Sequence, residues 1–279
     1  MRGIEGASTE ENIESNERNI SSLRLRTALK VSCVINNIRG ITVHGEENLD
    51  LIPPGSKPIF VCSHVTDGDL LVAAKVAAEK FDLLITSQST NFSNPMMSAS
   101  FSLAGRENFV PIEFKLNKDA HLGRIPLFNS QDYKLMKESM DSGKAPLFAA
   151  HNPTYGSLPD NGGVGAIYLS QLTPDSVIIP IGVDLHSKDG HVMNAETPVK
   201  NVLKGFKADV NIGVPFKLDK IDGIEQLDSI LAEKPSAETN KTVSSIFKKI
   251  REQSGILMSK MAGLLPKEKR GKWEPDIAG

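Results

Sequence analysis

Short apolar runs alternate with longer segments of helical period along most of this chain. The runs have the length and composition of buried strands: ITVHG (41–45), IFVC (59–62), LLIT (83–86), NFVPIEF (108–114), PLFAA (146–150), VIIPIGV (177–183) and ADVNIGV (208–214). Apolar residues recur at spacings of three and four over about 19–39, 67–80, 95–104, 130–142, 163–172 and 237–264. Strands and helices that alternate in this way form a mainly parallel, twisted sheet covered by helices on both faces. The sequence therefore predicts an α/β fold.

The composition fits one such domain and excludes several classes of protein. The 279 residues are 39% hydrophobic, enough for a substantial core. A formal net charge of −2 offers no basic field that would attract nucleic acid. No apolar run approaches the roughly 18 residues of a membrane span, and Cys33 and Cys62 are too few for a secreted disulfide framework. We expect a cytoplasmic or other reducing interior, with the protein soluble or peripheral on a membrane.

The ends of the chain differ in composition from its centre. Residues 1–18 are rich in Glu, Ser and Asn and have almost nothing to bury, so we expect a disordered leader there. The folded domain is predicted over residues 19–265. Residues 266–279, which include the run KEKR, are expected to form a basic tail.

Two predicted helices, at the two ends of the domain, combine an apolar stripe with basic residues. The stripe of 19–39 consists of Ile20, Leu23, Thr27, Val31, Val34 and Ile38, and that of the C-terminal helix (237–264) consists of Val243, Ile246, Phe247, Ile250, Leu257, Met261, Leu264 and Leu265. A stripe of this kind packs on the core or lies on a lipid surface. We favour core packing for the C-terminal helix and leave both open for the first. Peripheral membrane contact is expected through residues 19–39 and the 266–272 tail.

The run FVCSHVTDGD (60–69) ends an apolar strand with a histidine and an aspartate. One interpretation is structural: Thr66 caps the next helix with Asp69 as its capping-box partner, and His64 is a hydrogen-bonded strand-end residue. The other is catalytic: the imidazole takes a proton from a hydroxyl, while the carboxylate fixes its tautomer. His151 follows another predicted strand and is a second candidate, because sites form where parallel strands end.

Ordered motifs over about residues 20–216 resemble those of the glycerolipid acyltransferase superfamily, which includes the lysophosphatidate and glycerol-3-phosphate acyltransferases. The Asn-His-x4-Asp block of that family matches Ser63, His64 and Asp69, with Ser in place of Asn. The segment DSVIIPIGVDL, with its central proline, resembles the fourth block of the family. The resemblance implies that His64 is the general base and that Asp69 orients it.

Two other blocks depart from the family pattern. AGRENFVPI (104–112) is similar to the second block, but its arginine comes early. HNPTY (151–155) stands where the family has Pro-Glu-Gly-Thr-Arg, a loop that grips the acceptor's phosphate; loss of the glycine and the arginine puts a phosphate-bearing acceptor in doubt. The candidates for substrate binding are Ser63, Thr66, Gly105, Arg106, His151, Thr154 and Tyr155.

The resemblance implies an O-acyltransferase that moves a fatty acyl group from acyl-CoA or an acyl-carrier protein to a hydroxyl of a lysophospholipid, glycerol-phosphate or related lipid acceptor. We expect no cofactor and no metal, because His64, Asp67, Asp69 and His151 lack a recognisable ligand spacing. A Gly-x-Ser-x-Gly elbow, the mark of a serine hydrolase, is also missing. The alternative is a protein of this fold that has lost catalysis and binds lipid or a protein partner.

Overall fold

A seven-stranded sheet forms the centre of the structure, a computed structural model that describes residues 5–112, 115–116, 126–127, 130–187, 205–232 and 236–275. Its strands are β1 (Ile38–His44), β2 (Lys57–Cys62), β3 (Leu83–Gln88), β4 (Phe109–Ile112), β7 (Ala145–Ala149), β8 (Ser176–Ser187) and β9 (Phe206–Ile212). The short strands β5 (Lys115–Leu116) and β6 (Pro126–Leu127) pair separately. Each predicted strand lies in the main sheet, which confirms the α/β fold.

Apart from α1, the longer helices follow the predicted segments closely. They are α1 (Glu5–Ile35), α2 (Asp69–Ala77), α3 (Ser89–Ser93), α4 (Pro95–Ala104), α5 (Ser130–Asp141), α6 (Gly165–Leu172), α8 (Leu227–Ala232) and α9 (Ala237–Gly263). The start of α4 has a local cause, because the side chain of Asn94 accepts the backbone N–H groups of Met96 and Met97. A capping box between Ser236 and Thr239 starts α9 in the same way. The short helices α3 and α8 were not predicted.

The strand order is β1-β9-β8-β2-β7-β3-β4. Five neighbouring strands, from β8 to β4, run parallel, whereas β9 is antiparallel to β8 and β1 is parallel to β9. The prediction of a mainly parallel sheet is therefore confirmed. At one edge, the carboxyl ends of the five parallel strands lie beside the amino ends of β1 and β9, and we call this the carboxyl edge.

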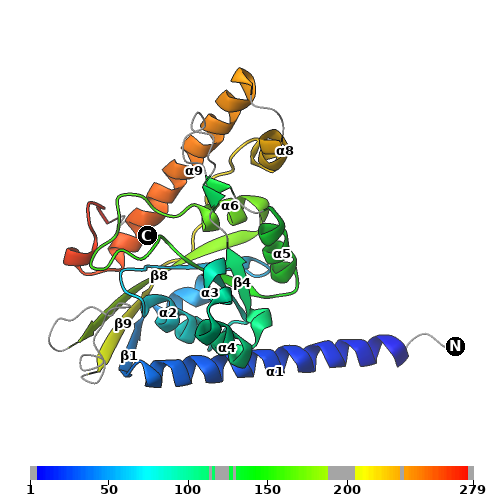
Figure 1. Ribbon diagram of the computed structural model, residues 1–279, viewed down its shortest axis with the longest axis vertical. Coiled ribbons are helices and arrows are strands. Elements are labelled where there is room, and N and C mark those ends of the chain that lie inside the picture. The colour runs from blue at the N-terminus through cyan, green and yellow to red at the C-terminus, as the bar shows by residue number, and fades with distance from the viewer. Residues whose placement is uncertain are drawn as a thin grey trace.

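Helices cover both faces of the sheet, and each face has its own hydrophobic core (Figure 1). On one face α5, α6 and α9 pack around buried residues such as Met136, Ile167 and Ile250. On the other, α1 and α2 pack around residues such as Leu25, Val72 and Phe206. The core interpretation of the C-terminal stripe is confirmed, because Val243, Ile246, Phe247, Ile250, Leu257, Met261 and Leu265 are all buried.

The first helix begins earlier than the sequence suggested. α1 starts at Glu5, so the leader expected to be disordered over 1–18 is helical from residue 5 onward. The prediction failed because it relied on residues that can be buried, whereas Glu, Ser and Asn also extend an established helix at modest cost.

Most of the apolar stripe predicted for 19–39 is the exposed face of α1, whereas Ile38 lies in β1 and is buried. Ile20, Leu23, Val31 and Val34 are each more than half exposed, and Leu25, Leu29 and Cys33 make the buried contacts instead. α1 is thus apolar on two sides, of which one packs on the sheet and on α2 and α4. None of the described helices is long and apolar enough to span a bilayer.

Candidate functional site

His64 and His151 meet at the carboxyl edge of the sheet. His64 follows β2 and His151 follows β7, and these neighbouring parallel strands pair Cys62 with Ala149 at their ends. The backbone N–H of His64 donates to Nε2 of His151 over 3.2 Å. Both strand-end histidines therefore lie at the edge where sites form in sheets of this kind.

A buried carboxylate holds the turn that carries His64. Asp69 is fully buried at the start of α2, and its Oδ2 accepts the backbone N–H groups of Val65 (2.8 Å) and Thr66 (3.1 Å). The hydroxyl of Thr66 donates to Oδ1 of the same carboxylate. Burial raises the pKa of Asp69 to about 7, although these hydrogen bonds and the charge of Lys269 oppose the rise. The carboxylate therefore stabilises the turn between β2 and α2.

The ring of His64 bonds to Thr66 rather than to Asp69. Its Nδ1 lies 2.9 Å from the carbonyl oxygen of Thr66, which can only accept, so Nδ1 carries the proton in the neutral ring. No hydrogen bond or ion pair joins this ring to Asp69 among the interactions of the described residues. The prediction that Asp69 fixes the tautomer directly was wrong, because its oxygens are taken up by the backbone and hydroxyl of the turn. Asp69 acts on His64 only through Thr66.

The other ring nitrogen of His64 is available for chemistry. With the proton on Nδ1, Nε2 bears a lone pair, and none of the described residues donates a hydrogen bond to it. Burial lowers the pKa of His64 below its ordinary value, whereas the Thr66 carbonyl and the charge of Asp67 raise it in part. The side chain is only partly buried. A neutral, oriented imidazole near pH 7 is what a general base requires.

His151 has a positioning role in this geometry. Its Nδ1 lies 2.7 Å from the carbonyl oxygen of Asn152, which leaves Nε2 to accept the N–H of His64. Burial is the main cause that lowers the pKa of His151 to about 4, so the ring stays neutral at physiological pH. The side chain is 5% exposed. His151 therefore holds the main chain of His64.

The loop after β7 is bound to the His64 turn along its length. The N–H of Thr154 donates to the carbonyl of His64 (3.3 Å) and that of Gly156 to the carbonyl of Val65 (3.1 Å). Between them, Tyr155 adopts a left-handed backbone conformation, with φ of 44°, and its phenol donates to Oδ1 of Asp67 over 3.0 Å. The loop at 151–155 thus presents a tyrosine to a carboxylate.

Three further candidates near His64 have structural partners. The hydroxyl of Ser63 accepts the N–H of Val183 over 2.9 Å and so extends the pairing of β2 with β8. Thr66 is fully buried against Asp69, and it supplies the carbonyl that fixes the His64 tautomer. The hydroxyl of Thr154 donates to the carbonyl of Ser157. These residues shape the site, and their hydroxyl groups are already engaged within the protein.

Gly105 and Arg106 lie away from this site, which corrects their assignment. They precede β4, so they belong to the edge where the parallel strands begin, opposite His64. The guanidinium of Arg106 lies over the ring of Phe92, 5.6 Å from its centroid. The resemblance of residues 104–112 to the second block was too weak to show at which end of the strand Arg106 would lie.

Sequence reasoning missed a lysine that the fold brings to the site. Lys269, in the turn η5 (Lys267–Lys269) after α9, donates to Asp184 on β8 over 2.5 Å, and its side chain is only 13% exposed. Its charge reaches Asp69 and favours the ionised carboxylate. The residues expected as a basic tail pack on the domain here, since the N–H of Leu158 also donates to the carbonyl of Lys269. No local pattern could have paired Lys269 with β8.

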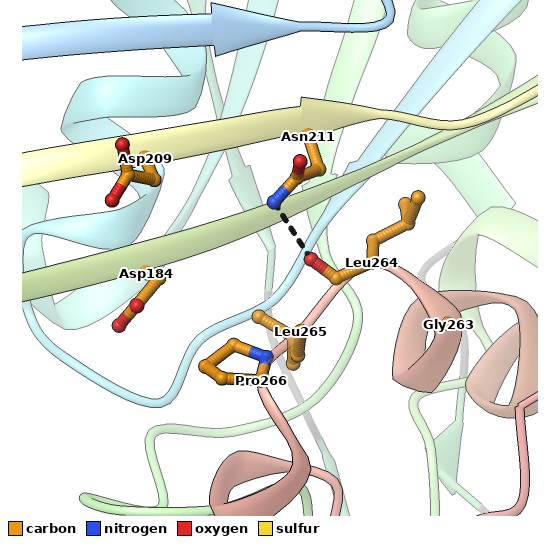
Figure 2. Close-up of a pocket in the computed structure, with 7 residues that line it drawn as sticks. All are labelled: Asp184, Asp209, Asn211, Gly263, Leu264, Leu265 and Pro266. Atoms are coloured by element: carbon orange, nitrogen blue, oxygen red, sulfur yellow. Dashed lines mark hydrogen bonds between the residues drawn. The ribbon is translucent and has the colours of Figure 1, made fainter.

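A polar pocket of about 340 Å³ lies beside Lys269, between β8, β9 and the end of α9. Figure 2 shows Asp184 and Asp209 on neighbouring strands, with the amide of Asn211 donating to the carbonyl of Leu264. Asp184 and Asp209 are cross-strand partners, a placement of like charges that costs stability. With His186 they form a group of potential metal ligands. Lys269 supplies a positive charge to this group through its ion pair with Asp184.

Comparisons with known proteins leave the identity of the chain open. No family model and no curated protein matches it. Among solved structures, the chain is similar to the 1-acyl-sn-glycerophosphate (LPA) acyltransferase PlsC from Thermotoga maritima, with 15% identity, a TM-score of 0.44, and coverage of 86% of this chain and 82% of that one.

Proposed function

We propose that the protein is an O-acyltransferase of the glycerolipid type. It moves a fatty acyl group from acyl-CoA or an acyl-carrier protein to a hydroxyl of a lysophospholipid, glycerol-phosphate or related lipid acceptor. The observation that carries this proposal is the state of His64: Nδ1 is bonded to the Thr66 carbonyl, and Nε2 is left with a lone pair at the carboxyl edge. The order of the sequence motifs supports the same reaction.

The reaction needs one base and no covalent intermediate. Nε2 of His64 takes the proton of the acceptor hydroxyl as its oxygen attacks the thioester carbonyl, and a tetrahedral oxyanion forms. Backbone N–H groups of the loops after the strands stabilise that oxyanion. The carbon–sulfur bond then breaks, and the departing thiolate takes the proton from the His64 imidazolium. Asp69 and His151 keep the base in place throughout, the first through Thr66 and the second through the main chain.

The pair formed by Tyr155 and Asp67 supports an acceptor without a phosphate near this loop. Where the family has an arginine that binds the phosphate, this chain has a phenol bonded to a carboxylate. A carboxylate and a phosphate repel each other, most strongly where water is partly excluded. A panel of phosphorylated and non-phosphorylated acceptors is needed to test this point.

The exposed face of α1 supports contact with a lipid surface. Val34 and Ile35, 76% and 72% exposed, end the helix just before β1, and the amino end of β1 lies at the carboxyl edge with His64. Arg24 adds positive charge to the exposed side of the helix, and Lys30, also exposed, pairs with Glu79 over 3.8 Å. A lipid acceptor held on this face is thus delivered to the edge of the sheet that carries the base.

His64→Ala in the purified protein tests the proposal. Labelled acyl-CoA and acyl-carrier protein are offered with the acceptor panel, and transfer should fall by roughly 10²–10⁴ while the fold is kept. The matched control is His44→Ala, since His44 is exposed in β1. In the unmodified protein, kcat/KM should rise with pH and reach half its plateau below pH 6.5, because burial lowers the pKa of His64. Full activity in His64→Ala would refute this mechanism.

The second candidate function is lipid binding without catalysis. The observation that favours it is the altered loop at 151–155, which lacks the glycine and the arginine of the family's third block. Vesicle binding without transfer to any member of the panel would support this candidate. Transfer confined to non-phosphorylated acceptors would instead support an enzyme with an altered acceptor.

A further inference from the structure

Asp67 is a carboxylate that the sequence motif leaves without a role. It lies in the turn between His64 and Asp69, and its Oδ1 accepts the Tyr155 phenol over 3.0 Å. Its Oδ2 is buried and has no hydrogen-bond partner among the described residues. The carboxylate is therefore oriented from one side, while its remaining oxygen has no protein donor.

Both oxygens of Asp69, in contrast, accept hydrogen bonds from groups of the turn. Two backbone N–H groups and the hydroxyl of Thr66 donate to its two oxygens, and Lys269 lies close enough for its charge to act on it. These donors occupy both oxygens of Asp69, and neither oxygen bonds to the His64 ring. Asp67 lies three residues after His64 in the same turn, and its charge raises the pKa of His64.

We propose that Asp67, braced by Tyr155, is the carboxylate that stabilises the His64 imidazolium during acyl transfer, the role that the His-x4-Asp motif assigns to Asp69. The inference rests on the proposed function. Asp67 acts through His64, so it is a positioning residue, and Tyr155 acts through Asp67. The loop that carries Tyr155 is suited to this task because backbone hydrogen bonds from Thr154 and Gly156 fix it to the His64 turn.

The charged and titratable groups around His64 allow the proposal to be isolated. Asp67 lies in its own turn, Asp69 begins α2, His151 follows β7, and Lys269 comes from the segment after α9. His151 stays neutral near pH 7 because burial lowers its pKa to about 4, so it contributes no charge there. Replacement of Asp67 alone thus changes the charge that acts on the ring.

The test is the titration of His64 followed by NMR in the substrate-free protein, with His64→Gln used to assign the signal. Asp67→Asn should lower the midpoint by roughly 0.5–1 pH unit, since an acidic partner favours imidazolium. Tyr155→Phe should lower it by less and should add nothing in the Asp67→Asn background. Asp160→Asn, which removes an equal charge at an exposed position paired with Lys272, is the matched control and should leave the midpoint unchanged.

An unchanged midpoint in Asp67→Asn overturns the proposal. If that variant does not fold, Tyr155→Phe, which keeps every charge, decides alone: an unchanged midpoint again overturns it. A purely structural tyrosine would give additive effects in the double variant, which would also overturn it. In activity assays Asp67→Asn should lower kcat/KM by roughly three- to tenfold. If the midpoint shifts but the protein transfers no acyl group, the Asp67–Tyr155 pair is supported and the proposed function is refuted. If the protein transfers acyl groups but the midpoint does not shift, the proposed function is supported and the role of the pair is refuted.

Discussion

Nε2 of His151 accepts the backbone N–H of His64 over 3.2 Å, so one histidine holds the main chain of the other and makes no hydrogen bond to its ring. The contact joins the ends of β2 and β7 beyond their last paired residues. It also requires His151 to stay neutral, because a protonated ring has no lone pair to offer. Acid should therefore act on the site through His151 before it acts on the sheet.

His151→Phe should destabilise the protein, since it leaves the N–H of His64 without its acceptor in a buried place. We expect a loss of roughly 1–3 kcal/mol in the free energy of unfolding, measured by urea denaturation at pH 7. The matched control is His44→Phe, at an exposed position of β1, which should change stability little. An equally stable His151→Phe variant would show that the contact contributes nothing.

The same variant should change the dependence of stability on pH. The ordinary pKa of a histidine is 6.5 and that of His151 in the folded protein is about 4, so the unfolded chain binds the extra proton between these values. Stability from neutral His151 is present above pH 6.5 and is lost as the pH falls toward 4. Asp69, whose pKa is raised from 3.8 to about 7, has the opposite sign and loses stability as the pH rises over that interval. His151→Phe should therefore lose less stability on acidification than the unmodified protein does.

Thr66→Val removes the hydroxyl that donates to Asp69 and keeps the shape of the side chain. The fully buried carboxylate then keeps only two backbone donors, and we expect a loss of roughly 1–3 kcal/mol in the free energy of unfolding at pH 8, where Asp69 is ionised. The loss should shrink at pH 5, where the carboxylate is protonated. Thr42→Val, at an exposed position of β1, is the control, and equal losses in both variants would contradict the prediction.

Lys269→Met should destabilise the protein by roughly 1.5–3 kcal/mol at pH 8, because Asp184 loses its charged partner and Asp69 loses a favourable charge. The effect should be smaller at pH 5, since protonated Asp69 has no charge for the lysine to stabilise. Lys267→Met, at an exposed position two residues earlier, should be close to neutral. Denaturation of both variants at the two pH values measures the difference, and identical curves would refute the role given to Lys269.

The double substitution Leu23→Ser and Val34→Ser tests the exposed face of α1. Binding to vesicles that contain anionic lipid should weaken by at least about tenfold, because burial of two large apolar side chains contributes roughly 1.5–3 kcal/mol each. The free energy of unfolding should stay nearly constant, since both side chains are more than half exposed. Ile256→Ser, on the exposed side of α9, is the control. Unchanged co-sedimentation with vesicles would remove α1 from the binding surface.

The sheet and the meeting of the two histidines follow from local pattern. Apolar runs of strand length, separated by helical periods, leave few alternatives to a parallel sheet, and parallel strands bring His64 and His151 to one edge. The orientation of α1 was less accessible, because residues of both sides, such as Leu23 and Leu25, are apolar. The sequence pattern identifies an apolar stripe on a helix, but it does not show whether that stripe packs on the sheet or is exposed to solvent.

The partners of the two carboxylates could not be predicted for a different reason. Whether Asp69 bonds to the His64 ring or to the Thr66 backbone depends on the dihedral angles of a single turn, and both choices fit the same spacing. The contact of Tyr155 with Asp67 depends on a left-handed residue in a loop. The contact of Lys269 with Asp184 joins segments that no local signal connects. Each of these contacts depends on the tertiary structure, which the periodicity of the sequence does not predict.

The position of Lys269 also bears on how the molecule is made. The strands and the His64 turn are synthesised first, while the lysine that stabilises ionised Asp69 comes from η5, after α9. A chain still on the ribosome can form the β2–β7 pairing and yet lack the cation that keeps this turn tight near neutral pH. Asp69 would then gain this nearby charge only as the segment after α9 docks, which separates the completion of the His64 turn from the folding of the sheet.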